Sequence, residues 1–572
     1  MKKYTSVFLF LAVLAVTTAC KRQTGEAVTQ VSIARIDQMP ALPQPLKIID
    51  WKQKVLQFDS LAFKFDNTAS YGPLIWLDSA RRNIDQVTFG QYTVIGDVRQ
   101  GPGRNVEFHE ALTTLNSLVS AGLVGIDKTS QNGYNFVKMS QNYFNSTNKW
   151  NIVMNNTNPE VAHLGGGYGR DWWYDVYPNV LYYGVAALFP DVENTVNIQH
   201  SVAEQFFKAD SVLAGNYDYS FFDYAQMKGM RNNVPWQQDA AGGHAYVLYS
   251  AYQKFGDKRY LKGAMSATEA LVNQKTSRFY EILLPFGAYT AARLNAEQGT
   301  HYDVAKLLNQ TFDGCQSKDG RYGWGVIAER WGDYDVYGLQ GSITDGGGYG
   351  FFMNSVAMAW PLVPMVKYEP QFARAIGKYM LNVVNASRLF YPDQINVKNQ
   401  WLPQLKELTH GIIGYEGVRK FDDLNNPSLK GVSPVAIGDG PKWVAGQPEE
   451  SMFSLYSTSI AGVFGAIVKT TNVEGILALD CNATDFYAEN PYPVTLYYNP
   501  YTETKTIIHK QESQIDLFDV ISKRYMAKNT TGNITIAIPA GEAMLIVALP
   551  TGTRIKSEGA RLKANGKVIA YK

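Results

Sequence analysis

Two kinds of apolar pattern alternate along the middle of this 572-residue chain. The stretch "AAGGHAYVLYSAYQKFG" (240–256) is small or apolar on every side, which is typical of a helix buried on most faces. The stretch "DKRYLKGAMSATEALVNQ" (257–274) has apolar residues at a spacing near 3.6, which predicts an amphipathic helix. Gly256 and Asp257 lie at the junction, where a glycine ends one helix and an aspartate starts the next. The two stretches therefore predict a hairpin of an inner and an outer helix.

The same alternation recurs between residues 74 and 470. Further pairs are 172–188 with 196–213, the two halves of 281–314, and the two halves of 347–387. The regions 74–145 and 449–470 have less regular helical patterns. The pairs share little sequence, so the period is structural. About a dozen paired helices with the apolar set inside can close into a ring that the amphipathic set covers.

The pattern changes near residue 477. Short β-branched or aromatic alternations such as "NITIAIPA" and "EAMLIVALP" are bounded by Asn, Gly and Pro, which predicts antiparallel strands. We expect a mainly α chain with four parts: a signal peptide (1–19), a linker with an extended lead-in segment (20–70), a helical domain (71–475) and a C-terminal antiparallel β-sandwich (476–572).

The amino terminus has the pattern of an export signal. "MKKYTSVFLFLAVLAVTTAC" combines two lysines, an apolar run and small residues before Cys20. The run is shorter than the roughly 20 residues that span a bilayer. The stretch resembles the bacterial lipoprotein signal, in which Cys20 is lipidated; ordinary cleavage nearby is the alternative. We expect a periplasmic or outer-membrane lipoprotein that meets the membrane only through its anchor. The absence of acidic residues directly after Cys20, where Lys21, Arg22 and Gln23 follow, favours the periplasm.

Charge and motifs exclude several classes of function. Lys and Arg number 53 against 51 Asp and Glu, with no basic tract, so we expect no nucleic-acid partner. Cys315 and Cys481 lack metal-ligand spacing and are expected in the interior, with no metal site. The signatures GxSxG, HExxH and GxxxxGK[ST] are absent from the sequence, which favours carboxylate chemistry without a cofactor.

One hairpin junction carries a family resemblance. "YQKFGDKRYLKGAMSATEAL" is similar to the junctions of six-hairpin glycosidases, which are (α/α)6 toroid enzymes that hydrolyse or eliminate polysaccharides. The resemblance covers residues 74–470 in pattern and indicates architecture without a specific family. It implies an (α/α)6 toroid followed by a small β-domain, as in polysaccharide-degrading bacterial lipoproteins. An open superhelix of helix pairs that binds a partner is the alternative.

The candidate chemistry is a set of carboxylates among aromatic residues and glycines. "GGGYGRDWWYDVYP" (165–178) has two aspartates one helical turn apart, and "RNNVPWQQDAAGGH" (231–244) has an aspartate before an inner helix. The stretch 322–350 is a long segment without a clear period, which is typical of functional loops. We expect an acid/base pair among these residues: Asp171, Asp175, Asp239, Glu329 and Asp345. Helix capping and surface ion pairs explain the same residues without function.

Aromatic and basic residues beside these acids are candidates for substrate contact. Phe, Trp and Tyr make up 13% of the chain, which suits either sugar-stacking clefts or a large aromatic core. Trp172 and Trp173 point to different helix faces, so at most one of them can line a cleft. Asp333 and Asp335 lack the ligand ladder of a calcium loop. The expected substrate-binding residues are Arg170, Trp172, Trp173, Trp236, His244, Trp324, Trp331 and Tyr337. Glu416 in "GIIGYEGVRKFDD" is a further plausible acid.

Paired carboxylates favour a glycoside hydrolase. One carboxyl group protonates the leaving oxygen while a second activates water or attacks the sugar. A carboxyl group beside apolar rings has the raised pKa that a general acid needs. Two alternatives stay open. One is a polysaccharide lyase that uses Tyr168 or His244 as base, with Arg170 and Arg231 neutralising a uronate. The other is a non-catalytic glycan-binding lipoprotein.

Overall fold

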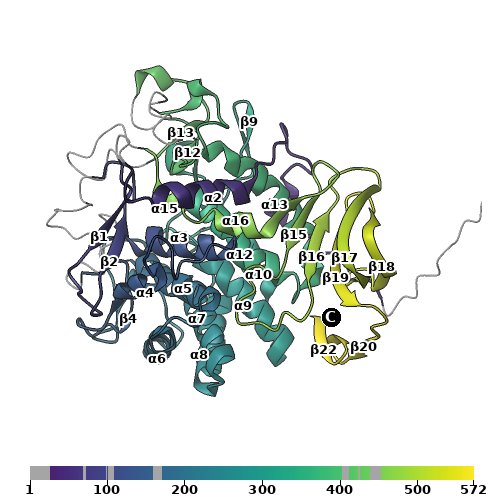
Figure 1. The fold of residues 1–572 in the computed structure, drawn as a ribbon, viewed down its shortest axis with the longest axis horizontal. Coiled ribbons are helices and arrows are strands. Elements are labelled where there is room, and N and C mark those ends of the chain that lie inside the picture. The colour runs from purple at the N-terminus through teal and green to yellow at the C-terminus, as the bar shows by residue number, and fades with distance from the viewer. Residues whose placement is uncertain are drawn as a thin grey trace, which may run out of the picture.

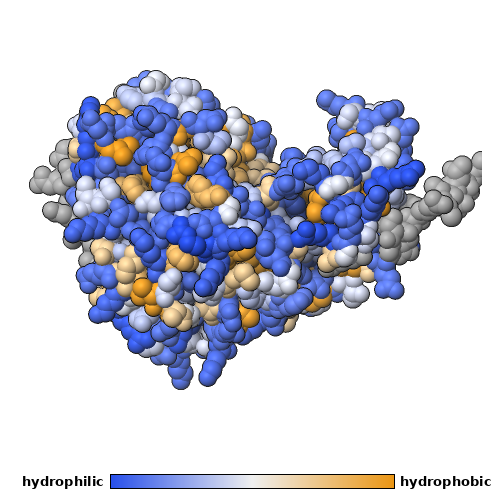
Figure 2. Space-filling model, turned by 90° about the horizontal axis from the view of Figure 1, so that it is seen from below, coloured by the Kyte–Doolittle hydropathy of each residue, from blue (hydrophilic) through white to orange (hydrophobic). Residues whose placement is uncertain are grey.

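The computed structural model describes residues 26–67, 72–97, 100, 109–158, 171–401, 403, 411–422, 426–438 and 452–571. They form a large helical body and a smaller C-terminal body of antiparallel sheet, which lie on the left and right of Figure 1. Polar residues predominate on the face seen in Figure 2, and the surface there is hollowed between the two bodies. In the part of the chain that the structure describes, no helix combines the length and apolar character needed to cross a bilayer.

The inner helices contact one another in a closed ring. Each contacts the next and the last returns to the first. Their side chains are almost all buried, which explains sequences that are apolar on every side. In chain order the ring comprises α3 (Ala111–Leu123), α5 (Trp172–Leu188), α7 (Ala240–Phe255), α9 (Leu283–Gln298), the pair α11 and α12 (Phe352–Ala357, Ala359–Met365) and the pair α15 and α16 (Leu455–Thr458, Gly462–Ile467).

A second set of helices covers this ring. Because each outer helix returns the chain to the start of the next inner helix, the inner helices run in the same direction. The predicted hairpin is confirmed: Gly256 ends α7 at φ 72°, and the Asp257 side chain accepts a hydrogen bond from the Arg259 N–H at the start of α8. The covering helices are α2 (Trp51–Ala62), α4 (Phe136–Ser140), α6 (Thr195–Leu213), α8 (Lys258–Asn273), α10 (Val304–Asp313) and α13 (Ala373–Ser387).

Helix α2 differs from the extended lead-in segment that the sequence predicted. Asp50 caps it by accepting a hydrogen bond from the Gln53 N–H. Trp51 packs edge-on against Phe464, with ring centroids 4.9 Å apart. In Figure 1 α2 lies beside α16, about four hundred residues later in the chain. The prediction was wrong here because the helix is stabilised by this distant partner, which the local sequence does not reveal.

The helical body also contains an antiparallel sheet that the sequence did not predict. Its order is β13-β12-β11-β10-β7, and three of these strands lie in the stretch 322–350 that was expected to be a loop. Strands of three residues are too short for alternation to show. β11 leads directly into α11, so the sheet lies at the amino end of an inner helix. The strands are β7 (Trp324–Val326), β10 (Gln340–Ser342), β11 (Tyr349–Phe351), β12 (Gly417–Arg419) and β13 (Val435–Ile437).

Short elements complete the helical body. β1 pairs with β2, β3 with β4, β5 with β6 and β8 with β9. Their bounds, with that of α1, are α1 (Ala34–Asp37), β1 (Ile75–Asp78), β2 (Thr88–Gln91), β3 (Phe144–Asn145), β4 (Ile152–Val153), β5 (Phe221–Asp223), β6 (Lys228–Met230), β8 (Arg330–Trp331) and β9 (Tyr334–Asp335).

The C-terminal body is antiparallel, as predicted. Its six-stranded sheet has the order β14-β15-β16-β19-β17-β18 and starts at residue 468 rather than 476. One face packs on the helical core, and the other has a small core of its own that includes Ile507 and Ile536. The strands are β14 (Val468–Thr470), β15 (Leu477–Asp480), β16 (Val494–Tyr498), β17 (Lys505–Asp519), β18 (Arg524–Ile538) and β19 (Ala543–Pro550), followed by a three-stranded sheet of β20 (Ile555–Glu558), β21 (Arg561–Ala564) and β22 (Lys567–Tyr571).

Helices α7 and α9 pack with their backbones in contact. A Cβ added to Gly242 would overlap the carbonyl oxygen of Leu283, and one added to Gly287 would meet the Cα of Gly242 at 2.8 Å. Only glycine allows this approach. It sets Asp239, which precedes α7, beside Tyr280, which precedes α9.

Candidate active site

Buried carboxyl groups precede four of the inner helices. Glu110, Asp171 and Asp239 are the N-cap residues of α3, α5 and α7, and Glu281 lies two residues before Leu283 at the start of α9. All four are buried. Since the inner helices run in the same direction, their amino ends gather at one end of the ring. We call this group, together with Glu416, the acid cluster.

Asp171 caps α5 and is tied to α7. Its Oδ1 accepts hydrogen bonds from the Trp173 N–H at 2.9 Å and from Gln237 Nε2 at 2.8 Å. Burial raises the pKa of Asp171 to about 6, although both hydrogen bonds favour the ionised form. The carboxyl group therefore titrates near neutrality.

Asp239 joins the amino ends of α7 and α9. Its Oδ2 accepts a hydrogen bond from the Tyr280 N–H at 3.2 Å. Burial raises the pKa of Asp239 well above its usual range, and the nearby charges of Asp171 and Glu281 add to this. The charge of Asp171 also raises the pKa of Glu281, so ionisation of one carboxyl group in this set disfavours ionisation of its neighbours.

Glu281 is held in an unusual backbone conformation. Its φ is 62°, in the left-handed region that residues other than glycine seldom adopt. Its carboxylate accepts a hydrogen bond from the Asn354 side chain of α11, and its carbonyl accepts one from Gln340 of β10 at 2.8 Å. Burial raises the pKa of Glu281 to about 8, despite the Asn354 hydrogen bond and the charge of Arg321. A strained, buried acid fixed from two elements is typical of a functional site.

Two tyrosines lie among these acids. Tyr174 of α5 hydrogen bonds with Tyr456 of α15. Burial raises the pKa of both hydroxyl groups, and the charges of Glu110 and Glu281 raise both further. Tyr456 also lies in the field of Glu416, which is buried and accepts a hydrogen bond from the Tyr349 hydroxyl at 3.1 Å. The tyrosine pair therefore connects acids that come from opposite parts of the ring.

Arg321 connects the acid cluster to more exposed residues. Its guanidinium lies 5.5 Å from the Tyr280 ring and 5.4 Å from the Trp324 ring. It also forms an ion pair with Asp345 at 3.5 Å. Arg321 and Asp345 are both about one-third exposed, so this side of the cluster reaches solvent.

The structure brings some of the predicted acids together and separates others. Asp171 and Asp239 belong to the acid cluster, and Asp345 lies at its edge through Arg321. Glu329 is 44% exposed and pairs with Lys420 at 2.8 Å, away from the residues that interact with Glu281. Asp175 is buried one turn into α5, and its charge acts on Tyr224. The structure thus gives no support to Glu329 or Asp175 as one of an acid/base pair.

His244 and Trp172 lie in the aromatic core. The His244 ring stacks on Phe206 at 4.3 Å and meets Trp172 edge-on at 5.6 Å. Burial lowers the pKa of His244 to about 3, so it is neutral at ordinary pH. Trp173 is also buried and stacks on Tyr177 at 4.9 Å. These rings were predicted to contact substrate, but their contacts are those of packing residues.

The other predicted aromatic residues have different environments. Trp324 is buried against Tyr280 at 5.1 Å and is therefore next to the acid cluster. Trp236 is half-buried under the Arg231 guanidinium at 3.8 Å, next in sequence to the Gln237 that holds Asp171. Trp331 is buried and donates to Glu329 at 3.0 Å, and Tyr337 packs against the main core. Trp236 and Trp324 thus lie next to residues of the site, whereas the contacts of Trp331 and Tyr337 are with Glu329 and with the main core.

Some predicted residues fall outside the described part of the chain. Arg170, Tyr168 and Cys20 are among them. Cys315 and Cys481 are buried free thiols, in agreement with the interior position expected for them. Among the residues that the structure describes, no group of three or more His, Cys, Asp and Glu side chains is arranged to hold a metal ion.

Sequence reasoning missed Glu110 and Glu281. Both come just before apolar helices, in "HEALTTLNSLVSAGL" and "YEILLPFGAY": Glu110 at the N-cap, as Asp171 and Asp239 are, and Glu281 one residue earlier. An acid just before an apolar helix is the shared signal.

Comparison with known proteins gives a weak structural likeness. No protein family and no curated protein matches the chain. A GH127 β-arabinofuranosidase matches with 11% identity over 93% of this chain and 85% of its own, at a TM-score of 0.37. The GH127 β-L-arabinofuranosidase of Geobacillus stearothermophilus T6 matches with 10% identity over 91% of this chain and 85% of its own, at a TM-score of 0.34. The endoglucanase CelQ of Clostridium thermocellum matches with 11% identity over 91% of this chain and 98% of its own, at a TM-score of 0.32. These proteins are glycoside hydrolases, but TM-scores below 0.5 leave the activity of this chain to be argued from its own site.

Proposed function

We propose that this protein is a glycoside hydrolase whose helical ring is an (α/α)6 toroid and whose acid cluster is the catalytic site. The observation that carries the proposal is the meeting of Asp171, Asp239 and Glu281 at the amino ends of adjacent inner helices, with pKa values raised by burial. A buried acid cluster of this kind is costly to fold, and a structural role alone does not require it.

The proposed general acid is Glu281. At neutral pH it is largely protonated, because its pKa is about 8, and it can deliver a proton to the leaving oxygen of a glycosidic bond. The Asn354 side chain donates to the Glu281 carboxyl group, and the Gln340 side chain donates to the Glu281 backbone carbonyl. Because both the side chain and the backbone of Glu281 are held, the proton is delivered in a fixed direction.

The proposed partner of Glu281 is Asp171. Its pKa of about 6 leaves it mostly ionised at pH 7, which suits a base that activates water or a nucleophile that attacks the sugar. The two groups precede α5 and α9, and the charge of Asp171 raises the pKa of Glu281. Asp239 also belongs to the proposed site: burial raises its pKa well above its usual range, and the charges of Asp171 and Glu281 raise it further.

The proposed substrate is a polysaccharide or oligosaccharide. The site has the aromatic rings of Tyr280 and Trp324 beside Arg321, and sugars pack their apolar faces on rings while their hydroxyl groups meet polar side chains. An arginine that is about one-third exposed at the edge of the site also suits a uronate-containing chain.

A polysaccharide lyase is the second candidate. Tyr280 lies beside Arg321. A lyase would use Tyr280 as the base and Arg321 as the cation that neutralises the uronate. Burial, however, raises the pKa of the Tyr280 hydroxyl well above its usual range, which makes the phenolate costly to form. A hydrolase therefore fits the site better.

The first experiment is a screen of plant, host and microbial glycans for released reducing ends. Wild-type protein is expected to release them from at least one glycan, without the ultraviolet absorption that a new double bond produces. Absorbing products would establish the lyase instead. If no glycan is cleaved in either way, the proposed function is wrong.

The second experiment separates the roles of the two acids. Glu281→Gln is expected to lower kcat about 10²- to 10⁴-fold on the natural glycan. It should retain most activity on a dinitrophenyl glycoside of the same sugar, because that leaving group needs no proton. Asp171→Asn should lose activity on both substrates. Glu369→Gln is the matched control, because burial also raises the pKa of Glu369 while its partners are Asn295 and Gln371.

Membrane attachment is proposed from the sequence alone. We infer that Cys20 is lipidated and that the protein is a lipoprotein of the cell envelope, in the periplasm or at the outer membrane. Growth with a radiolabelled or alkyne-tagged fatty acid should label the wild-type protein and leave Cys20→Ala unlabelled.

A further inference from the structure

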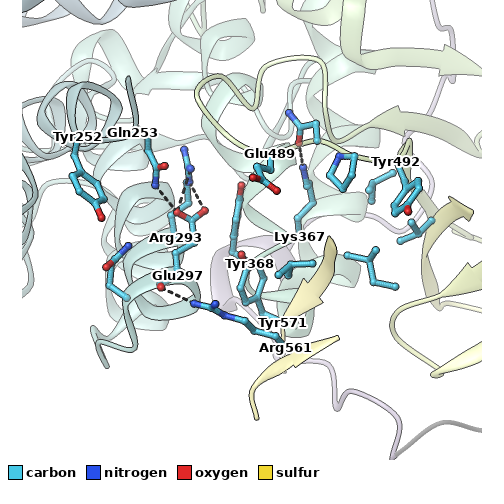
Figure 3. Close-up of a pocket in the computed structure, with 17 residues that line it drawn as sticks. Tyr252, Gln253, Arg293, Glu297, Lys367, Tyr368, Glu489, Tyr492, Arg561 and Tyr571 are labelled. Carbon is cyan, nitrogen blue, oxygen red and sulfur yellow. Dashed lines mark hydrogen bonds and ion pairs between the residues drawn. The ribbon is translucent and has the colours of Figure 1, made fainter. Parts of the chain in front are cut away.

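A cavity of about 340 Å³ lies where the helical body meets the C-terminal body. Figure 3 shows Tyr252 and Gln253 on one side of it and Arg561 and Tyr571 on another. Tyr252 belongs to the last turn of α7, whose first turn follows Asp239. A helix of 16 residues is about 24 Å long, so the cavity is separated from the acid cluster by the length of α7.

Aromatic rings form much of the cavity wall. Tyr368 and Tyr571 lie with ring centroids 5.6 Å apart and planes tilted by 31°. Tyr252 and Tyr492 line the cavity as well. Within the described residues, the hydroxyl groups of Tyr252, Tyr492 and Tyr571 have no hydrogen-bond partner in the protein. The cavity therefore offers ring faces together with hydroxyl groups available to a ligand.

The charged groups of the cavity are largely neutralised by one another. Arg293 pairs with Glu297 at 3.0 Å, and Lys367 pairs with Asp485 at 2.6 Å. Lys367 also donates to Asn482 and Asn490, so its ammonium protons are used within the protein. Arg561 also lines the cavity and donates to the Glu297 carbonyl at 2.7 Å. A charged ligand would therefore meet few groups that are not already engaged, so the cavity suits a neutral ligand.

Aliphatic and amide side chains also line the cavity. Apolar side chains from the C-terminal strands face polar side chains from α7 and α9. Known ligand pockets start at about 300 Å³, so this one suits a small ligand. Apolar faces combined with a rim of amides and hydroxyl groups match a sugar ring, whose C–H faces are apolar and whose edges are hydroxyl groups. The residues are Val494, Val547, Val568 and Ile569, with Gln253 and Gln298 opposite.

We propose that this cavity is an accessory binding site for a neutral mono- or disaccharide, separate from the acid cluster. The site holds sugar without cleaving it, since its only carboxylates are engaged with basic groups or lie at its edge. The proposal does not depend on hydrolysis at the acid cluster. It assigns a binding function to the junction of the two bodies.

Saturation-transfer difference NMR tests this proposal on the protein that begins at residue 20. The probes are glucose, galactose, cellobiose and lactose, with glucuronate as the charged comparison. At least one neutral probe is expected to bind saturably and glucuronate at least tenfold more weakly. Tyr252→Ala and Gln253→Ala each change a residue at the surface end of the cavity, and each should weaken binding of the neutral probe at least fivefold.

Two control variants locate the binding. Glu281→Gln alters the acid cluster and should leave binding of the neutral probe unchanged. Tyr322→Ala removes a tyrosine that is 55% exposed and next to Arg321, and it too should leave binding unchanged. Absence of saturable binding by every neutral probe would overturn the proposal. Binding that is lost in Glu281→Gln and kept in Tyr252→Ala would also overturn it, because the sugar would then lie at the acid cluster.

Discussion

Gln237 Nε2 donates a hydrogen bond of 2.8 Å to Asp171 Oδ1, and this bond ties the start of α5 to the start of α7. Gln237 is itself buried. The bond favours the ionised form of Asp171 and so opposes the effect of burial on its pKa. A side chain that touches no reacting atom thus sets the charge of a proposed catalytic group.

Gln237→Leu should move the acidic limb of the pH profile of kcat/KM to higher pH. Loss of the hydrogen bond raises the pKa of Asp171 above about 6, so a higher pH is needed to ionise it. Loss of one charge-assisted hydrogen bond corresponds to a shift of about one pH unit. The alkaline limb, assigned to Glu281, should stay in place. An acidic limb that does not move would show that Asp171 is not the group titrating there.

Glu281→Gln should stabilise the protein at alkaline pH relative to wild type. The pKa of Glu281 is about 8 in the folded protein against 4.5 for an ordinary glutamate, so the folded state holds a proton that the unfolded state releases. Its contribution is complete below about pH 4.5 and is lost as pH rises through about 8. The melting temperature of the variant minus that of wild type should therefore increase between pH 5 and pH 9. A difference that is constant with pH would contradict the buried, proton-retaining state of Glu281.

Gly242→Ala should lower both stability and activity. The new methyl group would overlap the Leu283 carbonyl oxygen and force α7 and α9 apart, which displaces Asp239 from Tyr280. Overpacking of this kind costs about 1–3 kcal/mol. Urea unfolding measures the loss of stability, and kcat on the cleaved glycan measures the displacement.

The matched control for that substitution is Gly263→Ala on α8. There the methyl group would meet the side chains of Leu248 and Phe207, which can move, at 3.0 and 3.2 Å. Alanine also favours a helix over glycine by up to about 1 kcal/mol. Stability should stay close to that of wild type, with unchanged kcat. Equal losses in the two variants would show that the contact between α7 and α9 has no special importance.

Lys367→Met should destabilise the junction of the two bodies. Lys367 pairs with Asp485, which is fully buried and also accepts hydrogen bonds from Tyr289 and Tyr368. Without the lysine the Asp485 charge is left buried, which costs about 3–5 kcal/mol. The double variant Lys367→Met with Asp485→Asn should recover part of this loss.

An exposed ion pair provides the comparison. Lys469 lies 3.7 Å from Asp480 with both side chains at least one-third exposed. Lys469→Met should change the free energy of unfolding by less than about 1 kcal/mol. Similar losses in Lys367→Met and Lys469→Met would contradict the importance of burial at the junction.

The hydrophobic pattern by itself determined the helical hairpins and the antiparallel C-terminal body. The hairpin at Gly256 was predictable because a left-handed glycine and a capping aspartate are local signals, and both act within one turn of the chain. Strands β7, β10 and β11 were not predictable, because each has only three residues and so shows no alternation of buried and exposed positions.

Only the tertiary structure decided which acids form the site. Glu329 and Glu281 are both glutamates near aromatic residues in the sequence, yet Glu329 is exposed and paired with Lys420 whereas Glu281 is buried beside Asp171. Burial and the neighbouring charges set the pKa of a carboxyl group, and both depend on segments distant in the chain. The sequence therefore shows which acidic residues are present, whereas the packing of the inner helices determines their protonation and their partners.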